Sequence, residues 1–193
     1  TVYTPRFEEE MGHHRETILA FLRSCPFYVR TAAGVTLAHA GGFPEADQRE
    51  ATATLCRFSH QAVLDRVARK LTNTNRRVLR DTIASQMEVP YAELARRYLA
   101  VDSSQSPRYD EYLTGVLAGF DEDFRLLWSA LFSRNEHEGG MAAYADQVTA
   151  LLNALSDGAH RQRVIETGHI GCRNGYRVLA RGQHLRVASG AHA

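Results

Sequence analysis

The chain has 193 residues, of which 44% are apolar and 23% charged, and 23 Lys and Arg against 22 Asp and Glu give a formal net charge of +1. This composition is typical of a chain with one large core or two small ones, and the near-zero charge argues against a dedicated nucleic-acid binder. No uncharged apolar run approaches the roughly 18–20 residues of a membrane-spanning helix, and the N-terminus has no signal-peptide pattern. We therefore expect neither nucleic acid nor a membrane as a partner.

The beginning of the chain predicts one helix followed by two strands. Apolar residues recur at helical spacing toward the end of residues 8–24, and Pro26 ends this helix. Residues 27–31 and 35–38 are β-type runs with a turn between them. The second strand is followed by a glycine-containing loop at residues 39–44, where a sharp turn is possible.

Helical periodicity replaces the strand pattern from about residue 45 to residue 156. The amphipathic stretches that predict helices are residues 61–71, 75–87, 91–100, 109–120, 124–132 and 141–155. The clearest loop is the Ser-rich segment at residues 102–107. The sequence thus predicts a helical block in the middle of the chain.

Strand patterns return near the C-terminus. Residues 163–166 form one β-type run, and residues 176–180 and 184–188 alternate around a turn, which predicts a β-hairpin. Because strands flank the helical block on both sides, we expect a mixed α/β (α+β) fold. We divide the chain into residues 1–44, with a helix and strands, a helical insert or cap at 45–119, and a return to helices and strands at 120–193.

The three cysteines, Cys25, Cys56 and Cys172, are far apart in the sequence. An odd number without paired spacing argues against a disulfide framework and against a cysteine-based zinc site. These observations predict a reducing, cytoplasmic environment.

Each of two predicted strands is followed by a histidine: residues 35–38 lead to His39, and residues 164–167 lead through Gly168 to His169. Loops at the carboxyl ends of strands form the ligand crevice of α/β sheets, and neutral imidazole binds zinc, iron and manganese. The two histidines could therefore bind one metal ion. Two unrelated polar residues at strand ends are the alternative, because zinc usually takes three or four protein ligands and hard ions need carboxylates.

Several short motifs resemble, in order, those of the calcineurin-like metallophosphoesterases, the family of the Ser/Thr protein phosphatases and diadenosine tetraphosphatases. Val-Thr-Leu-Ala-His-Ala-Gly at 35–41 resembles the family's "vHaG" segment, and the helix end at 21–26 is similar to the one that precedes it there. Leu-Leu-Trp at 126–128 resembles the "LLW" segment, Gly-His at 168–169 the "GH" segment, and residues 175–191 the closing hairpin. These matches cover about half of the chain.

The resemblance implies a β-sandwich flanked by helices, with two divalent ions (Mn, Fe or Zn) that polarise a phosphate and generate a hydroxide nucleophile. His39 and His169 are then metal ligands. Arg134, in the loop after the "LLW" segment, is a candidate for binding a phosphate oxyanion, with a solvated loop arginine as the alternative. His192 is a candidate for contacting the substrate. The implied activity is hydrolysis of a phosphate ester or anhydride, in a small molecule or a phosphoprotein.

Three motifs of that family do not occur in this sequence: Asp-x-His, Gly-Asp-x-x-Asp-Arg-Gly and Gly-Asn-His-Glu/Asp. They supply the remaining metal ligands and the catalytic histidine, so we expect no catalytic residue within this chain. Because the sequence begins at Thr1 rather than Met, we expect a fragment of a longer phosphoesterase, inactive by itself. The alternative is a non-catalytic protein-interaction module on a degenerate phosphoesterase scaffold. The oligomeric state stays open.

Overall fold

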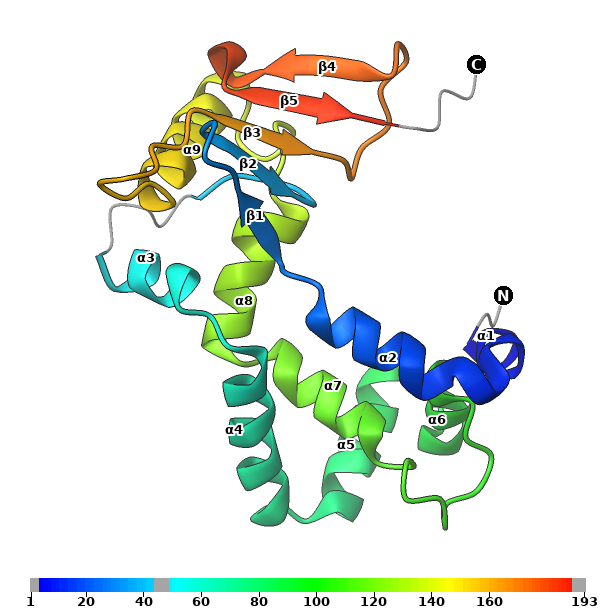
Figure 1. Cartoon of the computed structure of the whole chain (residues 1–193). Coiled ribbons are helices and arrows are strands. Elements are labelled where there is room, and N and C mark those ends of the chain that lie inside the picture. The colour runs from blue at the N-terminus through cyan, green and yellow to red at the C-terminus, as the bar shows by residue number, and fades with distance from the viewer. Residues whose placement is uncertain (1–3, 44–48, 189–193) are drawn as a thin grey trace. The chain divides into compact units, whose positions relative to one another are not determined.

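A computed structural model describes residues 4–43 and 49–188 of the chain (Figure 1). These residues form two compact units. The sheet unit comprises the described residues of 26–58 and those from Glu122 onward, and the helical unit comprises those up to Cys25 together with Ser59–Asp121. In the described part of the chain, no helix combines the length and apolar character needed to cross a membrane.

The sheet unit contains a five-stranded mixed sheet with the strand order β1-β2-β3-β5-β4 (Figure 1). The strands are β1 (Tyr28–Arg30), β2 (Val35–Ala38), β3 (Val164–Thr167), β4 (Tyr176–Leu179) and β5 (His184–Val187). β2, β3 and β5 run parallel, and β1 and β4 add antiparallel edges. In the register, Ala38 lies opposite Thr167, which lies opposite Arg186. The carboxyl ends of the three central strands therefore meet at one edge of the sheet.

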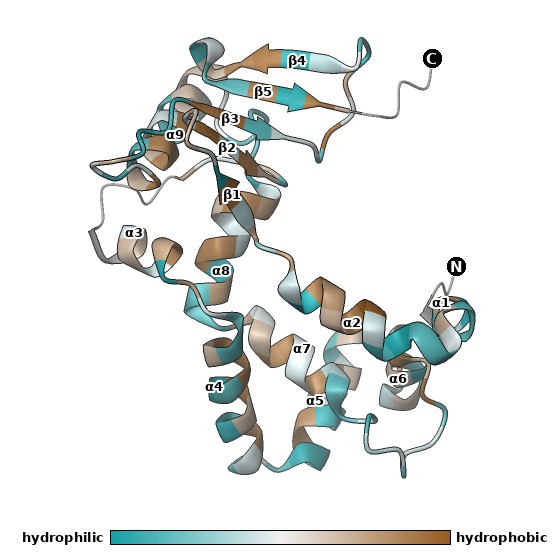
Figure 2. Ribbon diagram, in the orientation of Figure 1, coloured by the Kyte–Doolittle hydropathy of each residue, from teal (hydrophilic) through white to brown (hydrophobic). Residues whose placement is uncertain are grey.

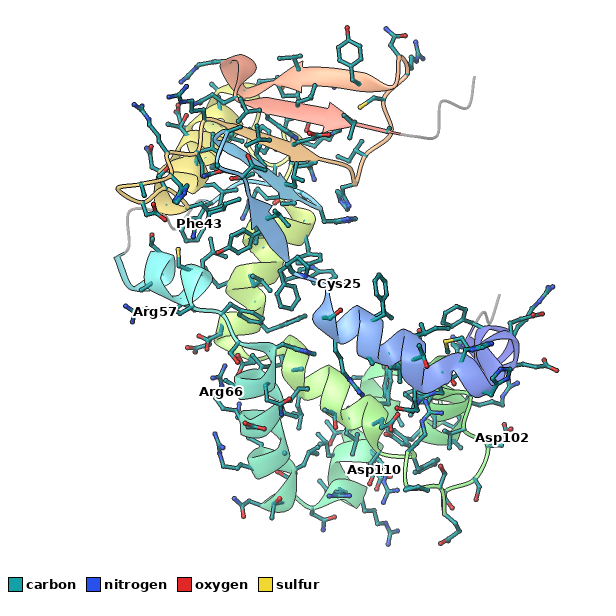
Figure 3. All side chains as sticks on the ribbon, in the orientation of Figure 1. Cys25, Phe43, Arg57, Arg66, Asp102 and Asp110 are labelled. Atoms are coloured by element: carbon teal, nitrogen blue, oxygen red, sulfur yellow. The ribbon has the colours of Figure 1, made fainter. Side chains whose placement is uncertain are left out.

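One face of the sheet is covered by the helix α9 (Met141–Ala154). Side chains of α3 (Arg49–Cys56), of α8 (Glu122–Trp128) and of the segment after α8 belong to the same core. The buried side chains of this core include Phe43 (labelled in Figure 3), Leu55, Leu127, Leu131, Tyr144, Val148, Leu151, Leu152, Leu155, Ile165 and Leu179. Thr36, Ile165 and His184 lie side by side in the register and are all buried on this face. Burial of this apolar set is the main favourable contribution to folding of the unit.

The opposite face of the sheet is also apolar, but it is open. Because side chains alternate along a strand, this outward face consists of Val29, Val35, Leu37, Val164, Glu166, Tyr176, Val178, Leu185 and Val187. Four of them are well exposed: Val29 (41%), Leu37 (39%), Tyr176 (62%) and Val178 (57%). Figure 2 shows the hydrophobic residues along the strands. The sheet therefore packs against the core on one side and presents apolar side chains to solvent on the other.

The described residues of the helical unit form the helices α1 (Thr4–Met11), α2 (Arg15–Ser24), α4 (His60–Thr72), α5 (Arg76–Met87), α6 (Tyr91–Leu99) and α7 (Glu111–Gly119), with a 3-10 turn (Gly12–His14) between the first two. The Ser59 and Asn75 side chains accept hydrogen bonds from backbone N–H groups in the first turns of α4 and α5, as helix caps do. Arg66 (labelled in Figure 3) donates two hydrogen bonds to Asp121, at 2.8 and 2.7 Å. This forked pair ties α4 to the end of the unit.

The expected mixed α/β fold is confirmed, and the predicted strands agree with the observed ones within a residue or two. The helix predicted over residues 8–24 was wrong in one respect, because Gly12 adopts a positive φ of 46° and separates α1 from α2. The helix α3 was not predicted. The described residues form one sheet, without the second sheet that a sandwich requires. The N-terminal helices group with the helical unit, whereas the sequence-based division placed them with the strands.

Candidate metal centre

Two histidine rings meet at the carboxyl edge of the sheet. His39 directly follows β2 and His169 follows β3 by two residues, and these strands are parallel neighbours. Nε2 of His39 lies 2.9 Å from Nδ1 of His169. The ring centroids are 4.8 Å apart and the rings are inclined by 67°. The fold thus brings together the two residues that the sequence suggested as metal ligands, and both side chains are open to solvent.

The distance between the two ring nitrogens fits a shared ion. Zinc–nitrogen bonds are about 2.0–2.1 Å long, so nitrogen–metal–nitrogen angles of about 90–109° place the nitrogens about 2.9–3.4 Å apart. The observed 2.9 Å lies at the short end of that range. The same distance also fits a hydrogen bond in which one neutral ring donates N–H to the other. The pair can therefore supply two ligands to a metal ion, or the two rings can form a hydrogen bond with each other.

The described residues do not complete a coordination shell around this pair. Among the side chains that the structure describes, those of residues 5–43 and 51–188, no group of three or more His, Cys, Asp or Glu is placed to hold a metal ion. Catalytic zinc sites usually have three protein ligands. An ion at this pair would take any further protein ligands from outside the described residues. His192, which the sequence suggested as a substrate contact, lies outside the described residues.

The backbone at His169 has an unusual conformation. Its φ is 66°, in the left-handed region that residues other than glycine rarely occupy, and the N–H of Ile170 donates to the carbonyl of Gly168 at 2.8 Å. A hydrogen bond across three residues with a positive central φ is typical of the strained γ-turn. Such strain persists where surrounding structure enforces it and clusters at binding sites. The turn aims the His169 ring at His39.

The loop that carries His39 is fixed by hydrogen bonds to neighbouring elements. The backbone N–H groups of Ala40 and Gly42 donate to the carbonyls of Leu131 (2.7 Å) and Ala130 (3.1 Å). A Cβ atom on Gly41 would fall 2.3 Å from Cδ1 of the buried Ile165. A larger residue at position 41 would therefore have to displace the Ile165 side chain of β3.

Arg134 lies beside the same loop, and its guanidinium is partly occupied: Nη1 and Nη2 are hydrogen-bonded, whereas the buried Nε has no partner among the described residues. Nη1 donates to Glu138 at 2.8 Å and Nη2 donates to Ser129 at 3.1 Å. The Cγ atom of Arg134 would lie 2.3 Å from a Cβ atom on Gly42, so its side chain packs directly against the loop backbone. A phosphate that binds Nη1 of Arg134 would therefore share this nitrogen with the Glu138 carboxylate or displace it.

A buried polar network behind the histidine pair was missed by the sequence analysis. His184 contacts Tyr144 Oη through Nδ1 (2.9 Å) and Thr167 Oγ1 through Nε2 (2.7 Å). Burial disfavours the charged ring and lowers the pKa of His184 to about 4, so the imidazole is neutral at pH 7. Thr167 ends β3 two residues before His169. The network therefore holds the end of the strand from which the γ-turn begins.

A buried ion pair lies on the same face of the sheet. Arg186 on β5 donates two hydrogen bonds to the Glu136 carboxylate, one of them 2.8 Å long, and both side chains are buried. These hydrogen bonds lower the pKa of Glu136 to about 2. The sequence signal was present in the alternation of β5, which places His184 and Arg186 on one face, but alternation alone does not say which face is buried.

Comparison of the chain with family models, with curated proteins and with solved structures found no match. The resemblance to metallophosphoesterases therefore rests on the short motifs at residues 35–41, 126–128 and 168–169, together with the helix end at 21–26 and the hairpin at 175–191. The first and third of these motifs contain the two histidines that meet at the sheet edge. The second lies at the end of α8.

Proposed function

We propose that this chain is part of a metal-dependent phosphoesterase and that His39 and His169 bind one metal ion in it. The observation that carries the proposal is the 2.9 Å separation of the two ring nitrogens, which come from positions 130 residues apart. In a two-metal centre, bound ions polarise the phosphate and lower the pKa of a water molecule to form the nucleophile. The role of this chain's pair is to hold an ion of that centre at the sheet edge.

The position of the pair in the fold supports this function. Both histidines follow parallel strands at their carboxyl ends, where open α/β sheets bind their ligands. Both rings are solvent-accessible, so a phosphate ester or anhydride can approach them. The left-handed backbone at His169 also fits this function, because it turns the ring toward His39.

The rest of the centre is proposed to come from polypeptide outside the described residues. Two observations support this: the described residues contribute no third ligand, and the outward face of the sheet is apolar and open. A domain of packed layers covers both faces of such a sheet. One further layer would complete a sandwich of the metallophosphoesterase kind and bring its own ligands to the His39–His169 edge. By itself the chain is then inactive.

The substrate side of the proposal involves Arg134. Its side chain adjoins the loop that begins at His39, and its guanidinium is already paired with a carboxylate, that of Glu138. A phosphate oxygen that replaces this carboxylate would make an equivalent charge-assisted hydrogen bond.

Metal binding by the chain itself is the first test. Zinc is titrated into the 193-residue protein and into its His39→Ala and His169→Ala variants, with His13→Ala, an exposed histidine of the helical unit, as the matched control. We expect the parent and the control to bind one zinc ion and each site variant to lose at least tenfold in affinity. Unchanged affinity in both site variants would refute the proposal.

Activity is the second test, in a longer protein that contains this chain and a covering layer. Metal content is measured by mass spectrometry and hydrolysis with p-nitrophenyl phosphate. His39→Ala and His169→Ala should each lower the metal content and reduce hydrolysis at least a hundredfold. His13→Ala should do neither. Full hydrolysis by a metal-free protein would contradict the proposed function.

One observation favours the non-catalytic alternative, a protein-interaction module. The 2.9 Å contact also fits a hydrogen bond between two neutral imidazoles, which needs no metal. In that case the His39→Ala and His169→Ala variants would be less stable to urea by about 1 kcal/mol, whereas neither the parent nor any variant would take up zinc. The zinc titration separates the two functions.

A further inference from the structure

The segment that follows α8 contains a π-helical turn, Ser129–Ser133, next to the loop of His39. The N–H of Arg134 donates to the carbonyl of Ser129 at 3.2 Å, a hydrogen bond across five residues rather than four. Single π turns inside helices are rare and occur frequently at functional sites. This one ends beside the candidate metal centre.

The π turn offers two carbonyls to the His39 loop. Ala130 and Leu131 accept hydrogen bonds from Gly42 (3.1 Å) and Ala40 (2.7 Å), the residues that follow His39. Both accepting residues are fully buried, so these hydrogen bonds are shielded from water. The backbone on which His39 sits is therefore fastened to this turn.

The same turn presents an aromatic ring to the His39 imidazole. The Phe132 ring stacks on it with a centroid distance of 5.7 Å and an interplanar angle of 28°. Phe132 also contacts the rings of Trp128, stacked at 5.2 Å, and Phe27, edge-on at 6.1 Å. These aromatic contacts restrict the Phe132 side chain, so its ring stacks on the His39 imidazole in a fixed orientation.

We infer that the π turn is a positioning device for His39 and that Phe132 is its positioning residue. An imidazole on an exposed loop can rotate about two side-chain torsions, and a half-turn about the second exchanges Nδ1 with Cδ2 and Nε2 with Cε1. The stack with Phe132 and the contact with His169 together select the rotamer that directs Nε2 toward Nδ1 of His169. As a role in metal binding, this inference rests on the proposed function; the orientation of the ring does not depend on it.

A substitution at Phe132 separates the aromatic face from simple packing. Phe132→Leu keeps an apolar side chain but removes the ring, and Phe132→Tyr keeps the ring. Phe124→Leu is the matched control, because Phe124 stacks on Trp128 (5.8 Å) at the other end of the same row of rings. All variants are made in the 193-residue protein, and the His39 ring signals are assigned by their loss in His39→Gln.

The first readout is the NMR spectrum of the His39 ring without metal. Phe132→Leu should remove the ring-current shift of the His39 ring protons by a few tenths of a ppm, whereas Phe132→Tyr and Phe124→Leu should preserve it. The second readout is zinc affinity, which should fall about tenfold in Phe132→Leu only, the size expected when a ligand loses its orienting contact. Thermal unfolding is recorded for each variant, so a loss of fold is recognised.

The outcomes distinguish the two proposals. If Phe132→Leu folds and keeps both the parental His39 shifts and the parental zinc affinity, the inference is overturned. If the His39 shifts change in Phe132→Leu but not even the parent binds zinc, the positioning role stands and the metal function fails. If Phe132→Leu unfolds, the comparison of Phe132→Tyr with the parent decides: a retained ring-current shift supports the role, and its loss overturns it.

Discussion

At the scale of single residues, the candidate site combines an ordinary histidine with a strained one. His39 lies in a loop with a regular backbone, whereas His169 has a φ of 66°. A side chain in the left-handed region costs about 1–2 kcal/mol relative to a regular conformation, and glycine avoids that cost. The strain at His169 is therefore measurable by substitution, independently of any metal.

We expect His169→Gly to be more stable than His169→Ala, by about 1 kcal/mol. Elsewhere in a folded protein, glycine is normally the less stable of the two, so the reversed order reports the positive φ. The free energy of unfolding is measured with urea for both variants without metal. Equal stability, or a more stable alanine variant, would show that position 169 is not held in the left-handed region.

Another residue-scale consequence concerns His184 and pH. Its pKa is lowered from 6.5 to about 4 in the folded state, chiefly by burial, with Arg186 lowering it further and Glu136 opposing. Between these values the unfolded chain binds a proton that the folded chain does not. The stabilising contribution is complete above about pH 6.5 and is lost as the pH falls toward 4.

We therefore expect the parent to lose about 2 kcal/mol more stability than a His184→Gln variant between pH 7 and pH 5. Urea unfolding at both pH values measures the difference. The contributions of the other histidines to the pH dependence cancel in this comparison, because parent and variant share them. The Glu136 carboxylate, with a folded-state pKa of about 2, titrates below this window. Parallel pH profiles for parent and variant would mean that His184 is accessible to protons in the folded state.

At the scale of elements, the close approach of the His39 loop to β3 sets how the site is assembled. We expect Gly41→Ala to destabilise the fold by about 1–3 kcal/mol, because the added methyl would meet Ile165 Cδ1 at 2.3 Å in a filled core. Gly115→Ala is the control, since its Cβ would meet nothing within 4 Å in α7. That change should stabilise the helix by up to about 1 kcal/mol. Thermal and urea unfolding of both variants check the two opposite signs.

The elements also show how much the sequence could predict. Residues 35–38 were predicted as a strand from their local β-type pattern, and the histidine after each of two strands was visible as a motif. The pairing of Val35 with Val164 could not be predicted from the sequence, because register between distant strands depends on burial and not on local pattern. The π turn after Trp128 escaped prediction because one extra residue in a single turn hardly changes the apolar periodicity.

At the scale of the whole molecule, the outward face of the sheet sets what the chain does in solution. Exposed Val178 and Leu37 belong to a face of which Glu166 is the single charged member. If a further layer covers this face in the complete protein, the 193-residue chain alone presents it to water. We expect the isolated chain to self-associate through it, because burying apolar area contributes about 25 cal/mol per Å².

Val178→Lys distinguishes the isolated chain from a longer protein in which this face is covered. The substitution should be favourable in the first and unfavourable in the second. In the isolated chain it should reduce self-association without loss of stability, since position 178 is solvent-exposed there. In a longer protein with the covering layer it should destabilise by about 2–4 kcal/mol, because an unpaired charge would then be buried. Val78→Lys, at an equally exposed valine of α5 in the helical unit, should change neither property. Light scattering and urea unfolding of both proteins measure these effects, and a Val178→Lys variant that is harmless in the longer protein would mean that this face remains uncovered.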